Sequence, residues 1–271
     1  MAIRPAQPQS IGGVLDTTFQ LYKASVLKLI PLSLLLVLAS CLQYIYIFAR
    51  GGSINPADPV AMLNMMSSWG YWLSLLVGVI GTTWITAAAY LKVAAIGTDD
   101  DLGIGAALQA SLPRVFAVFV MLILFSLAVA IGTLLLIIPG IILMVSLLLC
   151  YPTALFDNKG PVSALTESHR LVWGNWWRTF VMLTVGLIIL IVIYMIVATI
   201  VGMIAPFLMV GGAGAEDVLL YGMVSLVLIF VFLSLLLTPF YISLGIAIYW
   251  DLKLRKDGGD LAARAGALNP A

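Results

Sequence analysis

Five long stretches without a single charged residue decide what this chain can fold into. They cover residues 29–49, 59–91, 115–156, 179–215 and 218–250. An α-helix needs roughly 20 apolar residues to cross the hydrocarbon core of a bilayer, which is about 30 Å thick. Four stretches therefore fit one crossing each, and the third is about twice as long as one crossing requires. Hydrophobic residues make up 63% of the chain and charged residues only 9%, which is typical of an integral membrane protein.

The longest stretch contains a helix-breaking pair near its middle. Pro139 and Gly140 together favour a tight turn, because proline disrupts a helix interior and glycine adopts turn conformations freely. With a hairpin at this pair, the chain has six crossings, at about 27–49, 69–95, 115–138, 141–156, 179–204 and 218–249. The fourth is the shortest, at roughly 24 Å for a rise of 1.5 Å per residue. A helix that thins the bilayer, or enters it only in part, is the alternative there.

The distribution of basic residues supports six crossings and gives their orientation. If the N-terminus is cytoplasmic, all of the 13 Lys and Arg residues except Arg50 lie in cytoplasmic segments. Basic residues concentrate on the cytoplasmic side of membrane proteins. A single crossing through Pro139 would move the basic C-terminal segment outside and remove this asymmetry. We therefore expect a multi-pass domain over residues 1–256 with both termini cytoplasmic, and a flexible cytoplasmic tail over residues 257–271.

Three segments with a shared residue pattern precede the three predicted hairpins. Residues 14–18, 107–111 and 164–168 each contain a small or branched residue, a leucine, two variable residues and then Ser or Thr. Around the first and third segments, apolar residues recur at the 3.6-residue period of a helix. Amphipathic helices of this kind lie flat at the headgroup level. The sequence thus predicts an all-α membrane protein of three units, each an interfacial helix followed by a hairpin of two crossings.

Aromatic and basic residues mark one membrane boundary before the fifth crossing. Trp173, Trp176 and Trp177 precede Arg178. Tryptophan rings favour the headgroup level, and arginine favours the cytoplasmic side. We expect these four residues to anchor the chain at the inner boundary of the membrane.

Prolines point to a binding region inside the crossings. Pro152 and Pro239 both fall in the inner third of a predicted crossing. A proline there leaves a backbone carbonyl without its helical partner, and such a carbonyl either packs against a neighbour or lines a cavity. Together with Pro139 and Gly140, these residues form the predicted lipid or substrate region. Packed kinks without a ligand are the alternative.

Short motifs along the chain resemble a known group of bacterial proteins. They are Ile138-Pro139-Gly140-Ile141, Tyr151-Pro152, Asp157-Asn158-Lys159-Gly160, Ala164-Leu165, Ser168 and Leu171, and near the start Ser10-Ile11-Gly12-Gly13-Val14-Leu15-Asp16 with Phe19, Leu21 and Tyr22. In these positions the chain is similar to the YciC-like inner-membrane proteins and to the membrane domain attached to some glycerophosphoryl diester phosphodiesterases. The resemblance implies a multi-pass protein of the bacterial inner membrane. It does not imply phosphodiesterase activity, because we expect no counterpart here of the soluble catalytic barrel of those relatives.

Residues suited to catalysis, cofactors or metals are scarce. His169 is the one histidine, and the adjacent Ser168 does not face it on a helix. Cys41 and Cys150 both lie within crossings, where we expect them to pack as small apolar residues. No phosphate-binding loop, zinc spacing or dinucleotide motif occurs. The sequence therefore predicts no enzyme activity, no cofactor and no metal site.

Three functions remain open on this sequence. The first, which we favour, is a protein that binds, senses or handles lipid or another apolar molecule, since the basic inner rim attracts anionic headgroups. The second is a permease subunit that exports a hydrophobic substrate with a separate energising partner. The third is a small membrane enzyme acting on lipid, for which Asp157, Glu167 and His169 must gather at a cavity. The expected partners are membrane lipid and either a homo-oligomer or another membrane protein; nucleic acid is not expected.

Overall fold

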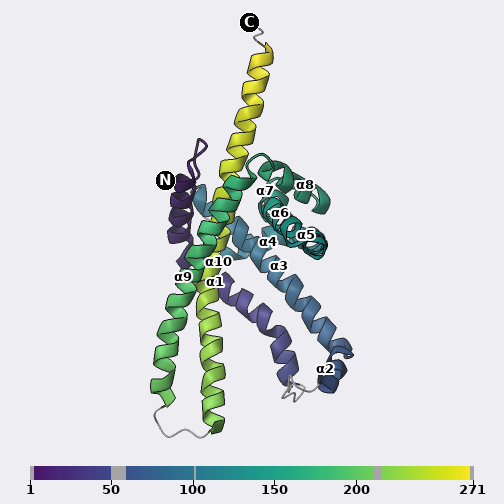
Figure 1. The fold of residues 1–271 in the computed structure, drawn as a ribbon, viewed down its shortest axis with the longest axis vertical. Coiled ribbons are helices and arrows are strands. Elements are labelled where there is room, and N and C mark those ends of the chain that lie inside the picture. The colour runs from purple at the N-terminus through teal and green to yellow at the C-terminus, as the bar shows by residue number, and fades with distance from the viewer. Residues whose placement is uncertain (1–2, 50–58, 101, 210–214, 269–271) are drawn as a thin grey trace.

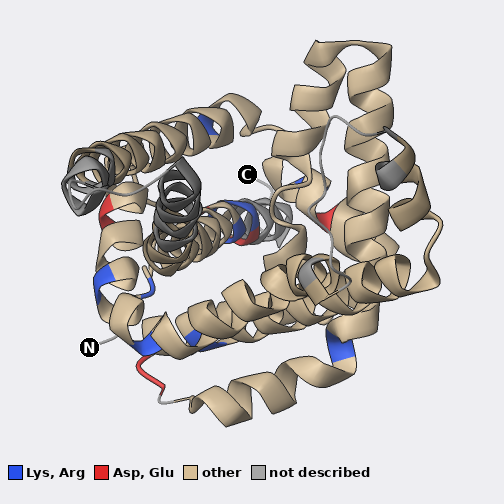
Figure 2. Ribbon diagram, turned by 90° about the horizontal axis from the view of Figure 1, so that it is seen from below, with Lys and Arg blue, Asp and Glu red and all other residues tan. Residues whose placement is uncertain are grey.

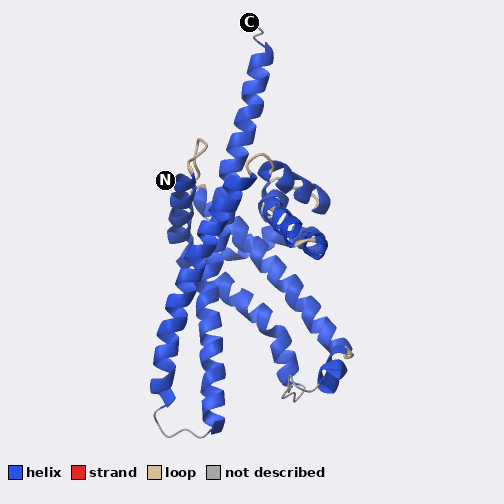
Figure 3. Cartoon of the chain, viewed as in Figure 1, coloured by secondary structure: helices blue, strands red, loops and turns tan. Residues whose placement is uncertain are grey.

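The protein is built from helices in the computed structural model, which describes residues 3–49, 59–100, 102–209 and 215–268 (Figure 3). No strand occurs within these ranges. Six helical segments among them are long and apolar enough to cross a membrane by length and composition. The expected all-α, multi-pass architecture is therefore confirmed. We call the end of the bundle near Arg178 and Asp251 the charged end.

The first hairpin consists of two long helices. α1 spans Ile11–Ala49 and α3 spans Trp69–Gly97, with the short α2 (Pro59–Met66) between them. They pack closely because glycine leaves room at the contact: a methyl group at Gly78 would lie 3.2 Å from the Ala39 carbonyl oxygen. A separate interfacial helix before residue 27 was expected, and that prediction is wrong. Residues 11–26 continue into the crossing as one helix that contains Pro31, since one proline removes a single hydrogen bond from a long helix.

The second hairpin turns at a different residue from the one predicted. It follows α4 (Ile104–Ser111) and the 3-10 turn η1 (Leu112–Arg114), and consists of α5 (Val115–Leu135) and α6 (Ile137–Ser146). The chain reverses at Leu136, which is extended, so a turn at Pro139-Gly140 is wrong. Pro139 is tolerated because it lies in the first turn of α6, where backbone N–H groups have no helical partner. Gly140 is needed for contact, because a methyl group there would overlap Thr133 of α5.

The fourth predicted crossing is two helices rather than one. α6 ends at Ser146, residues 147–149 form a turn, and α7 covers Cys150–Phe156. α6 alone extends about 15 Å at 1.5 Å per residue, which is half of a bilayer core. The α5–α6 hairpin also runs across the direction of the longest helices, because it is seen nearly end on in Figure 1, where those helices run vertically. The alternative of a crossing that enters the bilayer in part fits these features.

The third unit contains two long helices, one of which, α10, is the longest in the described part of the chain. α8 covers Pro161–Val172, α9 covers Trp176–Met209, and α10 covers Ala215–Leu268 with Pro239 inside it. Both long helices extend beyond the predicted crossings. The flexible tail predicted over 257–271 is helical as far as Leu268, and 269–271 lie outside the described residues. α10 projects past the rest of the molecule at the charged end (Figure 1).

The three repeated segments share a burial pattern that links their sequence to the core. The first residue of each segment is fully buried, and so is the Ser or Thr four positions later; these residues are Val14, Ala107 and Ala164, and Thr18, Ser111 and Ser168. Residues four apart lie on one face of a helix. The pattern therefore records one face of α1, α4 and α8 that packs inward. Charged residues are few in the molecule as a whole, and most of the ribbon in Figure 2 carries none.

Candidate functional site

An open cavity of about 670 Å³ lies between α6, the start of α9 and the segment that joins α8 to α9. It is lined by Ile138, Ile142, Trp173, Gly174, Asn175, Trp176, Trp177 and Arg178. We call it the aromatic pocket. Its size falls within the usual range for ligand sites, and its lining is mostly apolar with a few polar groups, as in such sites. All four residues predicted as the interfacial anchor therefore line one cavity.

The sharp corner between α8 and α9 positions the tryptophans. α8 ends at Val172, Trp173 is extended, and Gly174 takes a φ of +96°, a conformation that side chains rarely adopt. This corner leaves Trp173 and Trp177 well exposed at the mouth of the pocket, at 60% and 73%. Trp176 instead packs inward, where its ring stacks on Phe180 with centroids 5.3 Å apart. The pocket thus has a fixed aromatic floor and an exposed aromatic rim.

Beside the pocket, Arg178 takes part in a buried polar clasp. Asp251 of α10 is fully buried, and one carboxylate oxygen accepts hydrogen bonds from Arg178 at 3.0 and 3.2 Å and from Arg255 at 3.0 Å. The other oxygen accepts the backbone N–H of Gln9 at 2.8 Å. The Gln9 carbonyl in turn accepts from both arginines. We call Gln9, Arg178, Asp251 and Arg255 the clasp; it joins the N-terminal segment, α9 and α10.

The clasp carries an excess positive charge. Two guanidinium groups share one carboxylate, so the four residues together have a net charge of +1. Arg178 uses Nε and Nη2 in the clasp, and its Nη1 makes no hydrogen bond to any described residue. No Asp or Glu lines the aromatic pocket. The pocket therefore has one positively charged group at its boundary that no acid in its lining offsets.

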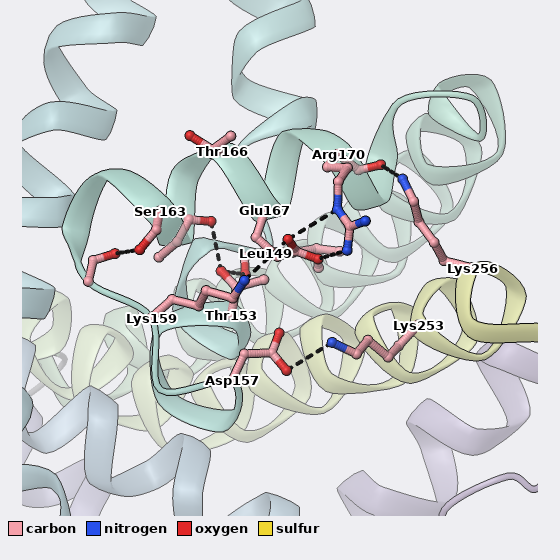
Figure 4. A network of polar contacts seen from close by, with 12 residues as sticks. Leu149, Thr153, Asp157, Lys159, Ser163, Thr166, Glu167, Arg170, Lys253 and Lys256 are labelled. Atoms are coloured by element: carbon pink, nitrogen blue, oxygen red, sulfur yellow. Dashed lines mark hydrogen bonds and ion pairs between the residues drawn. The ribbon is translucent and has the colours of Figure 1, made fainter. Parts of the chain in front are cut away.

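A second polar network lies where α7, α8 and α10 meet (Figure 4). Asp157 accepts hydrogen bonds from Lys253 and from the Tyr249 hydroxyl, each at 2.9 Å. Lys256 donates to the backbone carbonyl of Arg170 at 2.6 Å. Buried hydroxyls complete the contact between α7 and α8, because Thr153 donates to the Ala164 carbonyl at 2.9 Å. These bonds hold α8 against α10 at the charged end.

Glu167 belongs to this network and has an altered acidity. Arg170 donates two hydrogen bonds to its carboxylate, at 2.7 and 3.1 Å, and Lys159 lies 3.5 Å away. The Arg170 hydrogen bonds lower the pKa of Glu167 below its ordinary value of 4.5, and the positive charge of Lys159 acts in the same direction. Glu167 is therefore a structural anion that stays ionised at neutral pH.

Each acid that a lipid-active enzyme would need is paired with basic or hydroxyl side chains, and the histidine packs on a tryptophan ring. Asp157 is bound by Lys253 and Tyr249, and Glu167 by Arg170 and Lys159. The His169 ring packs on the Trp173 ring with centroids 5.0 Å apart. Within the described part of the chain, no three His, Cys, Asp or Glu side chains are grouped so that they could hold a metal ion.

The structure separates the four residues of the predicted lipid or substrate region into two groups. Pro139 and Gly140 lie in the turn of α6 that contributes Ile138 and Ile142 to the aromatic pocket. Pro152 and Pro239 are both buried in the packed core. Neither of these two lines any cavity described here. A shared ligand site at Pro152 and Pro239 remains a prediction without a cavity to support it.

Other cavities lie along the described helices. One of about 480 Å³ is wholly apolar and lies between α3 and α5, near Trp69, Trp72 and Phe119. A smaller one of about 190 Å³ lies between α1 and α3 and includes Ser40 and Gln43. The third, of about 670 Å³, lies between α5 and the start of α8, beside Lys159 and Glu167. Of all four, the aromatic pocket alone joins an apolar cavity to the clasp.

Sequence reasoning missed the clasp. Gln9 lies far from Asp251 in the chain, and nothing in its neighbourhood marks it. The available signal was the pair Asp251 and Arg255, an acid and a base four residues apart at the end of an apolar stretch. Such a pair is usually an exposed helix contact of small energy, so it did not stand out.

The fold and the pocket together define the class: an all-α, multi-pass membrane protein with an aromatic cavity beside a buried charge cluster. No protein-family model matches the chain, and no solved structure matches it. The resemblance to YciC-like proteins therefore remains a prediction.

Proposed function

We propose that this protein binds membrane lipid, or another amphiphile, in the aromatic pocket, as a non-catalytic component of the bacterial inner membrane with both termini in the cytoplasm. The observation that carries the proposal is the position of the cavity. Its rim residues Trp177 and Ile138 are apolar and 73% and 70% exposed, beside Arg178 at the charged end. An exposed apolar concavity of this kind marks a binding site.

Two features of the surroundings support this function. Tryptophans favour the headgroup level, so the pocket opens where polar and apolar parts of a lipid meet. The charged end carries most of the basic residues, which matches the side of a bacterial membrane that faces the cytoplasm. A lipid there has its headgroup near the clasp and its chains along α6.

Mass spectrometry of the protein purified in native nanodiscs tests the proposal. We expect one lipid or amphiphile class to be enriched over bulk lipid, to be lost in Trp177→Ala, and to be retained in Phe116→Ala. Phe116 is a matched control because it is 77% exposed on α5 and does not line the pocket. Bulk lipid composition in the wild type contradicts the proposal. A co-purifying ATPase with bulk lipid supports the permease subunit instead.

A further inference from the structure

We infer that the aromatic pocket selects amphiphiles with a net negative headgroup, and that Arg178 binds the negatively charged group. This inference rests on the proposed function and names the ligand class of the same site. Arg178 has 19% of its side chain exposed and lines the cavity, while it also holds the fully buried Asp251. Its position is therefore fixed before any ligand binds.

The hydrogen bonds of Arg178 leave one nitrogen of its guanidinium, Nη1, for a ligand. Nε and Nη2 point to Asp251 and Gln9, whereas both N–H groups of Nη1 have no partner among the described residues. A guanidinium held in place by a carboxylate presents its remaining N–H groups to a phosphate or carboxylate oxygen with little loss of side-chain freedom. Arg178 is thus a preorganised donor for an anionic group.

The charge balance points the same way. Arg178 is the one charged residue among the described residues that line the pocket, and no acid is among them. A headgroup with a net charge of −1 meets this cation directly, whereas a zwitterionic headgroup brings its own cation beside it. Close to a bilayer, screening by bulk water is reduced, so the two headgroups differ in their free energy of binding to the pocket.

The remaining lining identifies the ligand as an amphiphile rather than a free ion. Trp173, Trp177, Ile138 and Ile142 give the cavity mostly apolar walls, and Asn175 adds one amide near Arg178. Such walls suit the first part of an acyl chain. Free phosphate would bury its charge against them without any compensating apolar contact.

Arg255 provides a matched control for the role of Arg178. It binds the same Asp251 oxygen and the same Gln9 carbonyl, but it does not line the pocket. Loss of either arginine therefore weakens the clasp in a similar way. Only the loss of Arg178 removes a charge from the binding site.

The experiment uses nanodiscs with equal amounts of chain-matched phosphatidylglycerol, which is anionic, and phosphatidylcholine, which is zwitterionic. Native mass spectrometry measures which lipid stays bound to wild type, Arg178→Gln and Arg255→Gln. We expect the wild type and Arg255→Gln to prefer phosphatidylglycerol by roughly five- to tenfold, the effect of one nearby cation. Arg178→Gln should show a ratio near one. If Arg178→Gln does not fold, the double variant Arg178→Gln with Asp251→Asn is measured in its place. This double variant removes both charges of the ion pair.

Each other outcome is decisive. Equal binding of both lipids by the wild type overturns the charge selectivity and leaves the proposed function intact. An equal loss of preference in both single variants overturns the role of Arg178, because the clasp then acts only through structure. Displacement of bound lipid by glycerol 3-phosphate without acyl chains overturns the assignment to amphiphiles. Absence of any bound lipid overturns the proposed function itself.

Discussion

Asp251→Asn is the substitution that most directly tests the energetic role of the clasp. Asparagine keeps the shape of the side chain and can still accept the Gln9 N–H, but it no longer balances Arg178 and Arg255. Removal of one partner from a buried ion pair costs about 3–5 kcal/mol, mostly because the remaining charge is left unpaired. The two arginine side chains are 19% and 32% exposed, so water offsets part of this cost. We expect a loss of about 3 kcal/mol in the free energy of unfolding.

Reversible unfolding in mixed micelles of mild detergent and dodecyl sulfate, followed by tryptophan fluorescence, measures this loss. A change of about 3 kcal/mol shifts the unfolding equilibrium roughly a hundredfold. Asp257→Asn is the control, because Asp257 lies on the same helix and is exposed; it should leave the transition unchanged. If Asp251→Asn is as stable as Asp257→Asn, the clasp does not hold α9, α10 and the N-terminal segment together, and the reasoning fails.

Three further predictions follow from the packing, the acidity and the topology. Gly140→Val should lower the free energy of unfolding by about 1–3 kcal/mol in the same assay, because its side chain meets Thr133 of α5; an unchanged transition contradicts the hairpin contact. The pKa of Glu167 is lowered on folding, so its ionised form stabilises the folded state. This contribution to the free energy of unfolding, at most about 1 kcal/mol, is present above pH 4.5 and is lost as the pH falls through the folded pKa. Glu167→Gln should therefore be less stable than wild type at pH 7 and equal to it at low pH, and a constant difference counts against the ion pair. In a background without Cys41 and Cys150, a membrane-impermeant maleimide should label Ser67→Cys but not Ser163→Cys in intact cells, and the reverse result inverts the orientation.

The apolar stretches predicted the long helices well, because membrane crossing depends mainly on length and hydrophobicity. The repeated small and hydroxyl positions also correspond to a common buried face in α1, α4 and α8. The turn of the second hairpin was misplaced, because the rule that proline breaks a helix does not apply in a first turn. Leu136 has no local feature that marks it as the reversal, which is set by the packing of Gly132 against Gly140.

The site was predictable only in part for a similar reason. The three tryptophans and Arg178 lie within residues 173–178, so composition alone placed them at one boundary. Their grouping around a cavity depends on α6, which is brought there by the tertiary fold. The contact between Gln9 and Asp251 joins opposite ends of the chain, and no local pattern encodes such a contact.

The length of α10 has a mechanical consequence. At 1.5 Å per residue, its 54 residues form a rod about 80 Å long. The fixed point at Asp251 divides this rod into a longer arm within the apolar hairpin and a shorter arm, about half as long, that ends at Leu268. Asp251 is thus the point at which the clasp holds α10 in place. If α10 tilts as one rigid body about this point, its end at Leu268 moves in the direction opposite to the longer arm.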